Sequence, residues 1–399
     1  MKVLIVAENL ALSPDEVAYS FILNEVIKLS QRGLEVHVVR NAVGKGVTIA
    51  LNIHYHDVPK WKALDAFFFA LSRLGDFSPL LRHPKHLYRE ARYALLLSKT
   101  LQRTIPDVVH AHFAYPEGHV ARIALKDKKI PLVLTLHGYD ILTEPSINYG
   151  IRLSKKYDKI VRRVLNYADK IIVASKAMYE EAIKIASTEK ITLIPWGVDL
   201  NLFNPHVDGS AVREKHGLEN KFVVLFLKHH RLVYGGEYLI RAIPLVLKEK
   251  KNVVFVMGGD GPLRSYYEKL ARELGVLQYV IFTGYIKRST VPHYYAASDV
   301  VVVPSLQESW GLVVTEALAS GKPVIGSNVG GIRDQIIDGY NGFLVPPRDP
   351  RAIAEKIIYL AENPEEARRM GLNGRKMAEE RFNLEKRIDA ILRVYEELL

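Results

Sequence analysis

A repeated alternation of short apolar runs with longer amphipathic stretches constrains the fold of this chain more than any other feature. The runs are rich in Val and Ile, and their apolar residues are consecutive rather than alternating. Such runs are typical of central strands in a parallel sheet, and the stretches between them predict covering helices. The runs lie at 3–7, 36–39, 108–110, 132–136, 170–174, 191–194, 222–227, 253–257, 280–283, 300–304, 323–326 and 342–345. We therefore predict an α/β protein built from doubly wound βαβ units.

Two domains are expected from the length and from an internal similarity. The chain has 399 residues, 48% of them hydrophobic, which is enough for two ordinary cores. Residues 168–175 and 298–305 both place an Asp before a strand that ends in Ser. We interpret this as one sheet position that occurs in each of two similar domains.

The boundary between the domains is predicted from a linker that begins at Pro195 and is rich in turn-forming residues. We predict an N-terminal domain over 1–195 and a C-terminal domain over 196–381. The last helix, 382–399, is expected to pack back on the first domain. Residues 47–55 alternate between apolar and polar, which predicts an extra edge strand or arm.

Composition excludes several classes of protein. The chain has no cysteine, so disulfides, thiolate metal sites and cysteine nucleophiles are excluded, and a reducing cytoplasm is the expected location. No apolar run reaches the roughly 18–20 residues of a membrane-spanning helix. The first residues enter a strand pattern directly, without the basic leader of a signal peptide.

The net charge of +11 is concentrated in the first half of the chain. Within 60–103, many Lys and Arg residues are interleaved with aromatic residues. One interpretation is contact with an anionic membrane or an anionic acceptor. The other is a pair of core-facing helices with solvated basic residues. Nucleic acid is not expected as a partner, because no nucleic-acid-binding motif is present. The aromatic residues concerned are Trp61, Phe67, Phe68, Phe69, Phe77, Tyr88 and Tyr93.

The stretch 304–325 carries the strongest functional signal. A strand ends at Pro304, a loop holds Glu308, and a helix begins near Gly311. Ligands of open parallel sheets bind at the carboxyl ends of strands, where helix N-termini offer free N–H groups. The backbone expected to hold a diphosphate or a sugar there belongs to Ser309, Trp310, Gly311 and Leu312.

Glu308 and Glu316 lie before and inside this predicted helix. Two carboxylates at one site can each bind a pair of hydroxyls, one pair from a sugar and the other from a ribose. The alternative is structural, with Glu308 as a partner of the helix dipole and Glu316 as a solvated helix residue. Within the stretch 304–325 we favour the functional interpretation.

At these residues the chain resembles glycosyltransferase family 4, the group 1, glycogen-synthase-like transferases. The family pattern Pro-Ser-x-x-Glu-x-Phe/Trp-Gly-Leu-x-x-x-Glu-Ala-x-Ala-x-Gly-x-Pro-Val matches from Pro304 onward. Further matching segments lie at 135–140, 194–203, 258–263 and 330–334, so the resemblance covers nearly the whole chain. It implies the GT-B fold, in which two Rossmann-like domains face a central cleft.

The resemblance implies retaining transfer of a sugar from a nucleotide-diphosphate sugar to a lipid, glycan or small-molecule acceptor. It implies no metal and no cofactor beyond this co-substrate. By this resemblance, Glu308 binds hydroxyls of the donor sugar, Glu316 binds the ribose and Arg231 binds the diphosphate. A loop containing Gly284 and Tyr285 lines the base. His137 faces the donor sugar from the first domain.

The chain departs from the family pattern at two places. The segment 231–237 lacks the lysine that usually follows Arg231 at the second diphosphate position. Lys228, at the end of the same predicted strand, is our candidate substitute. The loop 8–14 after the first strand also lacks the common Gly-Gly pair, so contact between this loop and the donor is not expected.

Two pairs of histidines, His54 with His56 and His110 with His112, place two imidazoles on one strand face. Without an evident third ligand, no metal site is predicted. We instead assign His110 and His112, together with Asp140, to the acceptor side. No Asp-x-Asp occurs, which argues against a divalent-metal diphosphate clamp. The glycine-rich segment 258–261 does not fit the dinucleotide fingerprint, so a nicotinamide cofactor is not expected.

Two other functions are compatible with these motifs. One is an isomerase or hydrolase of nucleotide sugars on the same fold. The other is a non-catalytic subunit that binds a sugar nucleotide, which the missing lysine suggests. The sequence does not identify the base, the sugar or the acceptor.

Overall fold

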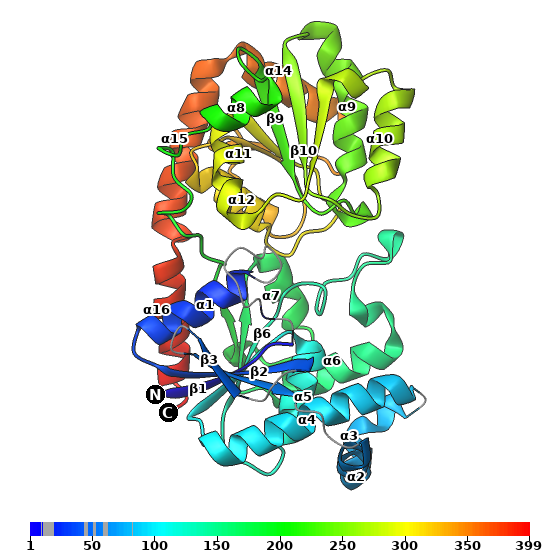
Figure 1. Ribbon diagram of the computed structural model, residues 1–399, viewed down its shortest axis with the longest axis vertical. Coiled ribbons are helices and arrows are strands. Elements are labelled where there is room, and N and C mark those ends of the chain that lie inside the picture. The colour runs from blue at the N-terminus through cyan, green and yellow to red at the C-terminus, as the bar shows by residue number, and fades with distance from the viewer. Residues whose placement is uncertain (9, 11–19, 44–46, 51–52, 59–62, 82) are drawn as a thin grey trace. The chain divides into compact units, whose positions relative to one another are not determined.

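The computed structural model describes residues 1–8, 10, 20–43, 47–50, 53–58, 63–81 and 83–399 (Figure 1). The chain forms two compact units. Unit 1 comprises Met1–Ile194 and Ile388–Leu399, and unit 2 comprises Pro195–Arg387. Within the described residues, no helix combines the length and the apolar character that crossing a membrane requires.

The sheet of unit 1 has the strand order β3-β4-β2-β1-β5-β6-β7-β8. Its strands are β1 (Lys2–Val6), β2 (Glu35–Val43), β3 (Val47–Ala50), β4 (Ile53–Val58), β5 (Val108–His112), β6 (Leu132–Thr135), β7 (Lys170–Val173) and β8 (Ile191–Leu193). Neighbouring strands are parallel except β3, which runs antiparallel to β4. The central strand β1 is fully buried from Val3 to Val6, as its consecutive apolar residues require.

Most helices of unit 1 lie between consecutive strands of this sheet in the chain. They are α1 (Ser20–Gln31), α2 (Ala63–Ser72), α3 (Leu74–Phe77), α4 (Pro84–Thr104), α5 (His119–Leu125), α6 (Lys155–Tyr167), α7 (Lys176–Ala182) and most of α16 (Leu384–Glu396). In α16 the Tyr395 hydroxyl lies 2.6 Å from His110 Nδ1, and Asp389 pairs with Arg32 at 2.8 Å. The end of the chain is therefore held by residues of unit 1.

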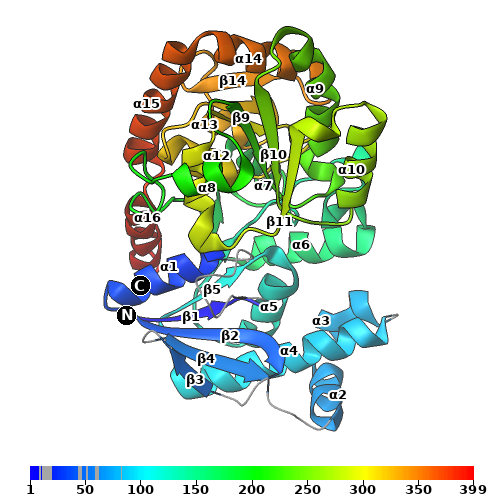
Figure 2. The ribbon, with the colours of Figure 1, turned by 45° about the horizontal axis from the view of Figure 1, so that its top comes forward.

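The sheet of unit 2 is entirely parallel in the order β11-β10-β9-β12-β13-β14 (Figure 2). Its strands are β9 (Phe222–Leu227), β10 (Val253–Gly258), β11 (Val280–Gly284), β12 (Val300–Val303), β13 (Val324–Ser327) and β14 (Gly342–Val345). Its helices are α8 (Ser210–His216), α9 (Gly236–Glu249), α10 (Arg264–Glu273), α11 (Val291–Ala297), α12 (Leu312–Ala319), α13 (Ile332–Gln335), α14 (Pro350–Glu362) and α15 (Pro364–Arg381). Apolar residues of α9, α10 and α14 form one buried core with the strands.

The predicted α/β class is confirmed, and every apolar run that we predicted as a central strand overlaps a strand. The extra edge strand predicted within 47–55 is confirmed as β3, but the prediction that one element extends over the whole range is wrong. The structure has two strands there, β3 at the edge and β4 inside, with Thr48 opposite Tyr55. Both strands of an antiparallel pair can alternate between apolar and polar residues. The alternation alone therefore did not reveal that the chain reverses direction. Residues 51–52 lie outside the described part.

Candidate functional site

Lys228 and Glu308 form an ion pair at the carboxyl edge of the unit 2 sheet. Lys228 follows β9, Glu308 follows the neighbouring strand β12, and the ammonium donates to Glu308 Oε2 at 2.6 Å. The two side chains are only 9% and 11% exposed. Burial opposes the charged form of Lys228, but the Glu308 carboxylate outweighs it and raises the pKa of Lys228. The lysine therefore carries a full positive charge at a strand end, beside a carboxylate that it orients.

Gly311 allows the Glu308 loop to enter helix α12. It has φ +94°, and a Cβ at this position would lie 3.1 Å from Glu308 Cγ. Only glycine adopts this conformation at low cost. The Trp310 indole is buried and donates to Thr315 Oγ1 at 2.9 Å, so this side chain supports the loop from within. What Trp310 can offer to a ligand is its backbone.

Glu316 lies on α12 and has both carboxylate oxygens engaged. Arg288 donates to Oε1 at 2.6 Å, and the Tyr295 hydroxyl donates to Oε2 at 2.9 Å. Burial opposes the charge of Arg288, but Glu316 outweighs this effect and raises the pKa of the guanidinium. The structural alternative of a solvated Glu316 is wrong, because the residue is only 5% exposed.

Arg288 is not among the site residues predicted from the sequence. It lies just after the loop that begins at Gly284 and Tyr285, beyond the end of β11. The available signal was a basic residue following a strand end in the sheet that carries Glu308. Tyr285 is exposed on this loop, and Gly284 has φ +71°.

Arg231 is exposed in the turn between β9 and α9. Among the described residues, no carboxylate forms an ion pair with it. The carboxyl ends of β9, β11 and β12 meet at one edge of a parallel sheet. This edge therefore carries the cations Lys228, Arg231 and Arg288 together with the start of α12.

In unit 1, Asp140 fixes the loop that carries His137. Its Oδ1 accepts from the backbone N–H groups of His137 and Gly138, at 3.0 and 2.9 Å, and its Oδ2 accepts from Ala114 at 2.9 Å. Burial raises the pKa of Asp140 despite these donors. The assignment of Asp140 to the acceptor side needs correction. Its buried carboxylate connects the segments that follow β5 and β6, so it positions other residues.

The prediction that His110 and His112 lie on the acceptor side also needs correction. Both are fully buried, so neither can touch an acceptor. His110 lies within hydrogen-bond distance of Thr135 Oγ1, at 2.7 Å, and of the Tyr395 hydroxyl. Tyr395, which covers His110, belongs to the last helix of the chain. The strand pattern around His110 does not indicate this contact. His112 Nδ1 lies 3.2 Å from His137 Nε2, so His112 helps to position the His137 ring.

Comparison with known proteins identifies the family. Residues 20–202 match the model described as Glycosyltransferase Family 4, and residues 209–377 match that of glycosyl transferases group 1. A D-inositol 3-phosphate glycosyltransferase of Xylanimonas cellulosilytica is 31% identical over 302 residues, which cover 72% of this chain and 71% of that protein. This chain belongs to glycosyltransferase family 4.

Further relatives of this family 4 transferase extend the comparison to nearly full length. An N-acetyl-alpha-D-glucosaminyl L-malate synthase of Bacillus anthracis is 26% identical over 380 residues, covering 93% of this chain and 91% of that protein. The structure of Anabaena HepE in complex with UDP and glucose matches with a TM-score of 0.78 and 24% identity, covering 99% of both chains. The predicted GT-B fold and glycosyltransferase class are confirmed.

The transferase contains a third potential metal ligand that its sequence did not reveal. Glu25 of α1 lies beside His110 and His112, with one ligand atom of each within 4.8 Å of the others. Glu25 Oε1 is 3.5 Å from His112 Nε2. His56, in the other pair, lies 2.9 Å from His37, and burial lowers its pKa to about 4. His110, His112 and His56 are thus buried in polar clusters, whereas His54 is partly buried.

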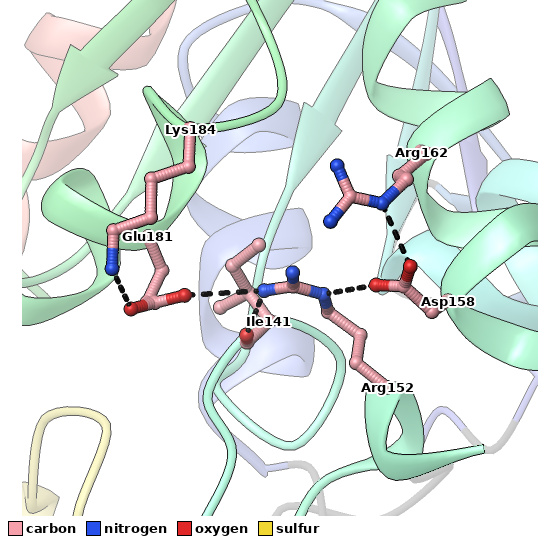
Figure 3. A network of polar contacts seen from close by, with 6 residues as sticks. All are labelled: Ile141, Arg152, Asp158, Arg162, Glu181 and Lys184. Carbon is pink, nitrogen blue, oxygen red and sulfur yellow. Dashed lines mark hydrogen bonds and ion pairs between the residues drawn. The ribbon is translucent and has the colours of Figure 1, made fainter. Parts of the chain in front are cut away.

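In the family 4 transferase, a polar network around Arg152 contacts the segment that follows β6 at Ile141 (Figure 3). Arg152 donates to Asp158 at 2.8 Å, to the Ile141 carbonyl at 2.8 Å and to Glu181 at 3.3 Å. Arg162 also donates to Asp158, at 2.7 Å. This network connects the segment after β6 to α6 and α7. Asp140 and Arg152 therefore hold the same loop at two points.

The basic, aromatic stretch 60–103 of the transferase divides into two parts. Phe77 and Tyr93 are fully buried, so for them the core-facing interpretation holds. Helix α2, in contrast, exposes a row of large apolar side chains. Among them are Leu64 (60% exposed), Phe67 (56%), Phe68 (59%) and Leu71 (49%). Lys60, Trp61, Lys62 and Arg82 lie outside the described residues, as do residues 9 and 11–14 of the loop after β1.

Proposed function

We propose that this glycosyltransferase transfers a sugar from a nucleotide-diphosphate sugar to an acceptor hydroxyl, with retention of anomeric configuration and without a metal ion. The main support is the Lys228–Glu308 pair beside the start of α12, at a strand edge that also carries Arg231. The UDP and glucose bound to HepE, a protein of the same fold, agree with this donor class.

We assign the donor-side roles from the charges of these residues together with the family resemblance. Lys228 and Arg231, with the N–H groups at the start of α12, stabilise the negative charge that develops on the departing diphosphate. Glu308 accepts hydrogen bonds from hydroxyls of the transferred sugar. Glu316, held by Arg288 and Tyr295, accepts those of the ribose. Gly284 and Tyr285 line the base.

The transfer breaks the bond between the sugar's anomeric carbon and the diphosphate oxygen. A bond from the acceptor oxygen forms on the same face, and the acceptor proton moves to the departing phosphate oxygen. This step needs no side-chain nucleophile. His137, whose backbone N–H is fixed by Asp140, orients the donor sugar. The positive charge comes from Lys228 and Arg231, which makes a divalent cation unnecessary.

The test is a nucleotide-release assay on the purified protein with a panel of nucleotide-diphosphate sugars, with and without acceptor extract, in EDTA. We expect acceptor-dependent release, and a product whose anomeric configuration, read by NMR, matches that of the donor. Acceptor-independent turnover would instead indicate a hydrolase or isomerase, and binding without release a non-catalytic subunit. Complete loss in EDTA that magnesium restores would contradict the metal-free mechanism.

We also propose that the enzyme works in the cytoplasm and contacts an anionic membrane peripherally through helix α2. Leu64, Phe67, Phe68 and Leu71 follow the i, i+3, i+4, i+7 spacing of one helix face, and all are exposed. Lys85 and Arg89 on helix α4 are exposed too, which suits anionic headgroups.

Flotation with phosphatidylcholine vesicles, with or without phosphatidylglycerol, tests this contact. We expect binding only to the anionic vesicles, and its loss when Phe67 and Phe68 are both changed to Ser. Leu372→Ser is the matched control, because Leu372 is 62% exposed but lies on α15 of unit 2. Equal flotation of the double variant would contradict the contact through α2.

A further inference from the structure

Unit 1 carries a groove of about 530 Å³ that is lined by residues of α5 and α6. Pockets for small molecules measure about 300–1,000 Å³, so the groove has the size for such a ligand. Four of its lining residues are cationic and one is acidic. Arg122 comes from α5, while Lys159, Arg162, Arg163 and the acid Asp158 come from α6. The charge of the lining therefore favours an anionic ligand.

The acid of this lining is already engaged by two arginines. Asp158 accepts from Arg162 at 2.7 Å and from Arg152 at 2.8 Å (Figure 3). Burial opposes the charge of Asp158, but the two guanidinium groups outweigh it and lower the pKa of the carboxyl group. Arg122 pairs at 3.0 Å with Asp76, which does not line the groove. Asp158 is therefore compensated and repels an incoming anion only weakly.

Lys159 and Arg163 are the uncompensated cations of the groove. Neither forms an ion pair with any residue that the structure describes. The two lie four residues apart on α6, and Lys155 lies four residues before Lys159. Like charges at this spacing destabilise a helix. The stability of α6 therefore does not explain this row of cations, whereas an anion bound to Lys159 and Arg163 would relieve the repulsion between them.

The number of free cations indicates the class of anion. A phosphate monoester carries a charge of about −2 near pH 8, which matches the two charges of Lys159 and Arg163. A phosphate diester or a carboxylate brings a single negative charge and would leave one cation without a partner. The forked guanidinium of Arg163 also suits the paired oxygens of a phosphate group.

We propose that this groove is a further ligand site of the enzyme and that it binds a phosphate monoester. Lys159 and Arg163 contact the phosphate oxygens, and the partly buried Tyr167, which also lines the groove, packs against the organic group. All of these residues belong to unit 1, whereas the donor-side cations belong to unit 2. The site is therefore separate from the one that we assign to the donor diphosphate, and binding there requires no donor.

Acetylation of lysines by acetic anhydride, read residue by residue by mass spectrometry, locates the phosphate. Lys159 is exposed, so its amine is accessible to the reagent. We expect saturating methyl phosphate to slow acetylation of Lys159 about threefold or more, because the bound phosphate holds the ammonium form. Lys155, exposed on the same helix but outside the lining, is the internal control and should react at an unchanged rate. Equal rates at Lys159 with and without methyl phosphate would overturn the proposal.

Calorimetric titration of methyl phosphate at low ionic strength measures the contribution of each cation. Lys159→Met and Arg163→Met should each weaken binding about tenfold, with unchanged circular dichroism spectra. Lys155→Met, which removes the same charge from the same helix, should bind like the wild type. Dimethyl phosphate, a monoanion, should bind about tenfold more weakly than methyl phosphate.

Two results of this titration would contradict the site. Loss of binding in Arg231→Met, together with wild-type affinity in Lys159→Met and Arg163→Met, would place the phosphate at the sheet edge of unit 2. Equal affinity of the wild type for methyl and dimethyl phosphate would refute the monoester as the ligand. Either outcome overturns the proposal.

Flotation distinguishes the two sources of a phosphate monoester, a soluble molecule and a lipid headgroup. Vesicles that contain phosphatidate present a monoester, and the Phe67→Ser/Phe68→Ser background removes the proposed contact through α2. In this background, flotation that is lost when Lys159 and Arg163 are both changed to Met would support the site with a lipid as its ligand. Binding of methyl phosphate without such flotation would support the site with a soluble ligand.

Discussion

The Lys228 ammonium lies 2.6 Å from the Glu308 carboxylate, although 80 residues separate them in the chain. The pair is nearly buried, at the edge where β9 and β12 end side by side. A buried ion pair is weak evidence for stability by itself, because burial of two charges costs about as much as their attraction returns. Its position beside the start of α12 is better explained by a role toward a ligand.

Substitutions can separate the role of the Lys228–Glu308 pair in catalysis from its role in stability. Glu308→Gln should lower kcat about 100-fold, because a transition-state contact is lost, with an unchanged circular dichroism spectrum. Lys228→Met should lower kcat similarly and destabilise the fold by about 3 kcal/mol, since Glu308 is left without its counter-ion. The double variant Lys228→Met/Glu308→Met should recover stability but not activity. Recovery of activity would show that the pair is only structural.

Arg288 and Glu316 are expected to act as one unit in nucleotide binding. Arg288→Met removes the cation that orients Glu316 Oε1, and Glu316→Ala removes the acceptor itself. Each variant should weaken binding of the nucleoside diphosphate that the wild type releases at least tenfold, measured by titration calorimetry. Lys287→Met, at the exposed neighbouring position, is the control. Wild-type affinity in both variants would refute the ribose assignment.

Glu90 should make the stability of unit 1 depend on pH. Burial raises its pKa from 4.5 to about 7, against the opposing hydrogen bond from Tyr115. Because the folded state holds this proton more tightly than the unfolded state, the contribution of Glu90 to stability is fully present below about pH 4.5 and is lost as pH rises through 7. The shift corresponds to about 3 kcal/mol.

Denaturant unfolding between pH 4 and 8 measures this effect. Glu90→Gln keeps a partner for Tyr115 but cannot ionise, so its free energy of unfolding should fall less with pH than that of the wild type. Glu180→Gln, at an exposed glutamate, should follow the wild type. Identical pH profiles for wild type and Glu90→Gln would contradict the assignment.

Arg152 should control the order of the loop that carries His137. Arg152→Lys keeps the charge, but a single ammonium cannot replace a guanidinium that bonds Asp158, Glu181 and the Ile141 carbonyl together. We expect faster hydrogen exchange at residues 138–153 by at least fivefold, with little change in the core strands. Arg162→Lys is the matched control, since Arg162 donates to Asp158 from an exposed position. Equal exchange in the two variants would argue against this positioning role.

Much of the fold and of the donor-side site could be predicted from the sequence, because the signals are local. Consecutive β-branched residues, as in β12, indicate a strand buried on both faces wherever it lies in the sheet. The loop with Glu308 and the start of α12 at Gly311 follow from residues that are neighbours in the chain. The family resemblance rests on the same local motifs, and the comparisons confirm it.

Tertiary structure decided which distant residues share a site. The partner of Glu316 is Arg288, 28 residues away, and a strand pattern does not indicate which basic residue reaches which carboxylate. His110 and His112 have the same pattern whether their face of the sheet meets a ligand or a helix. Tyr395, 285 residues after His110, covers that face. Strand order and the return of the last helix determine such contacts, and both depend on long-range packing that local periodicity does not encode.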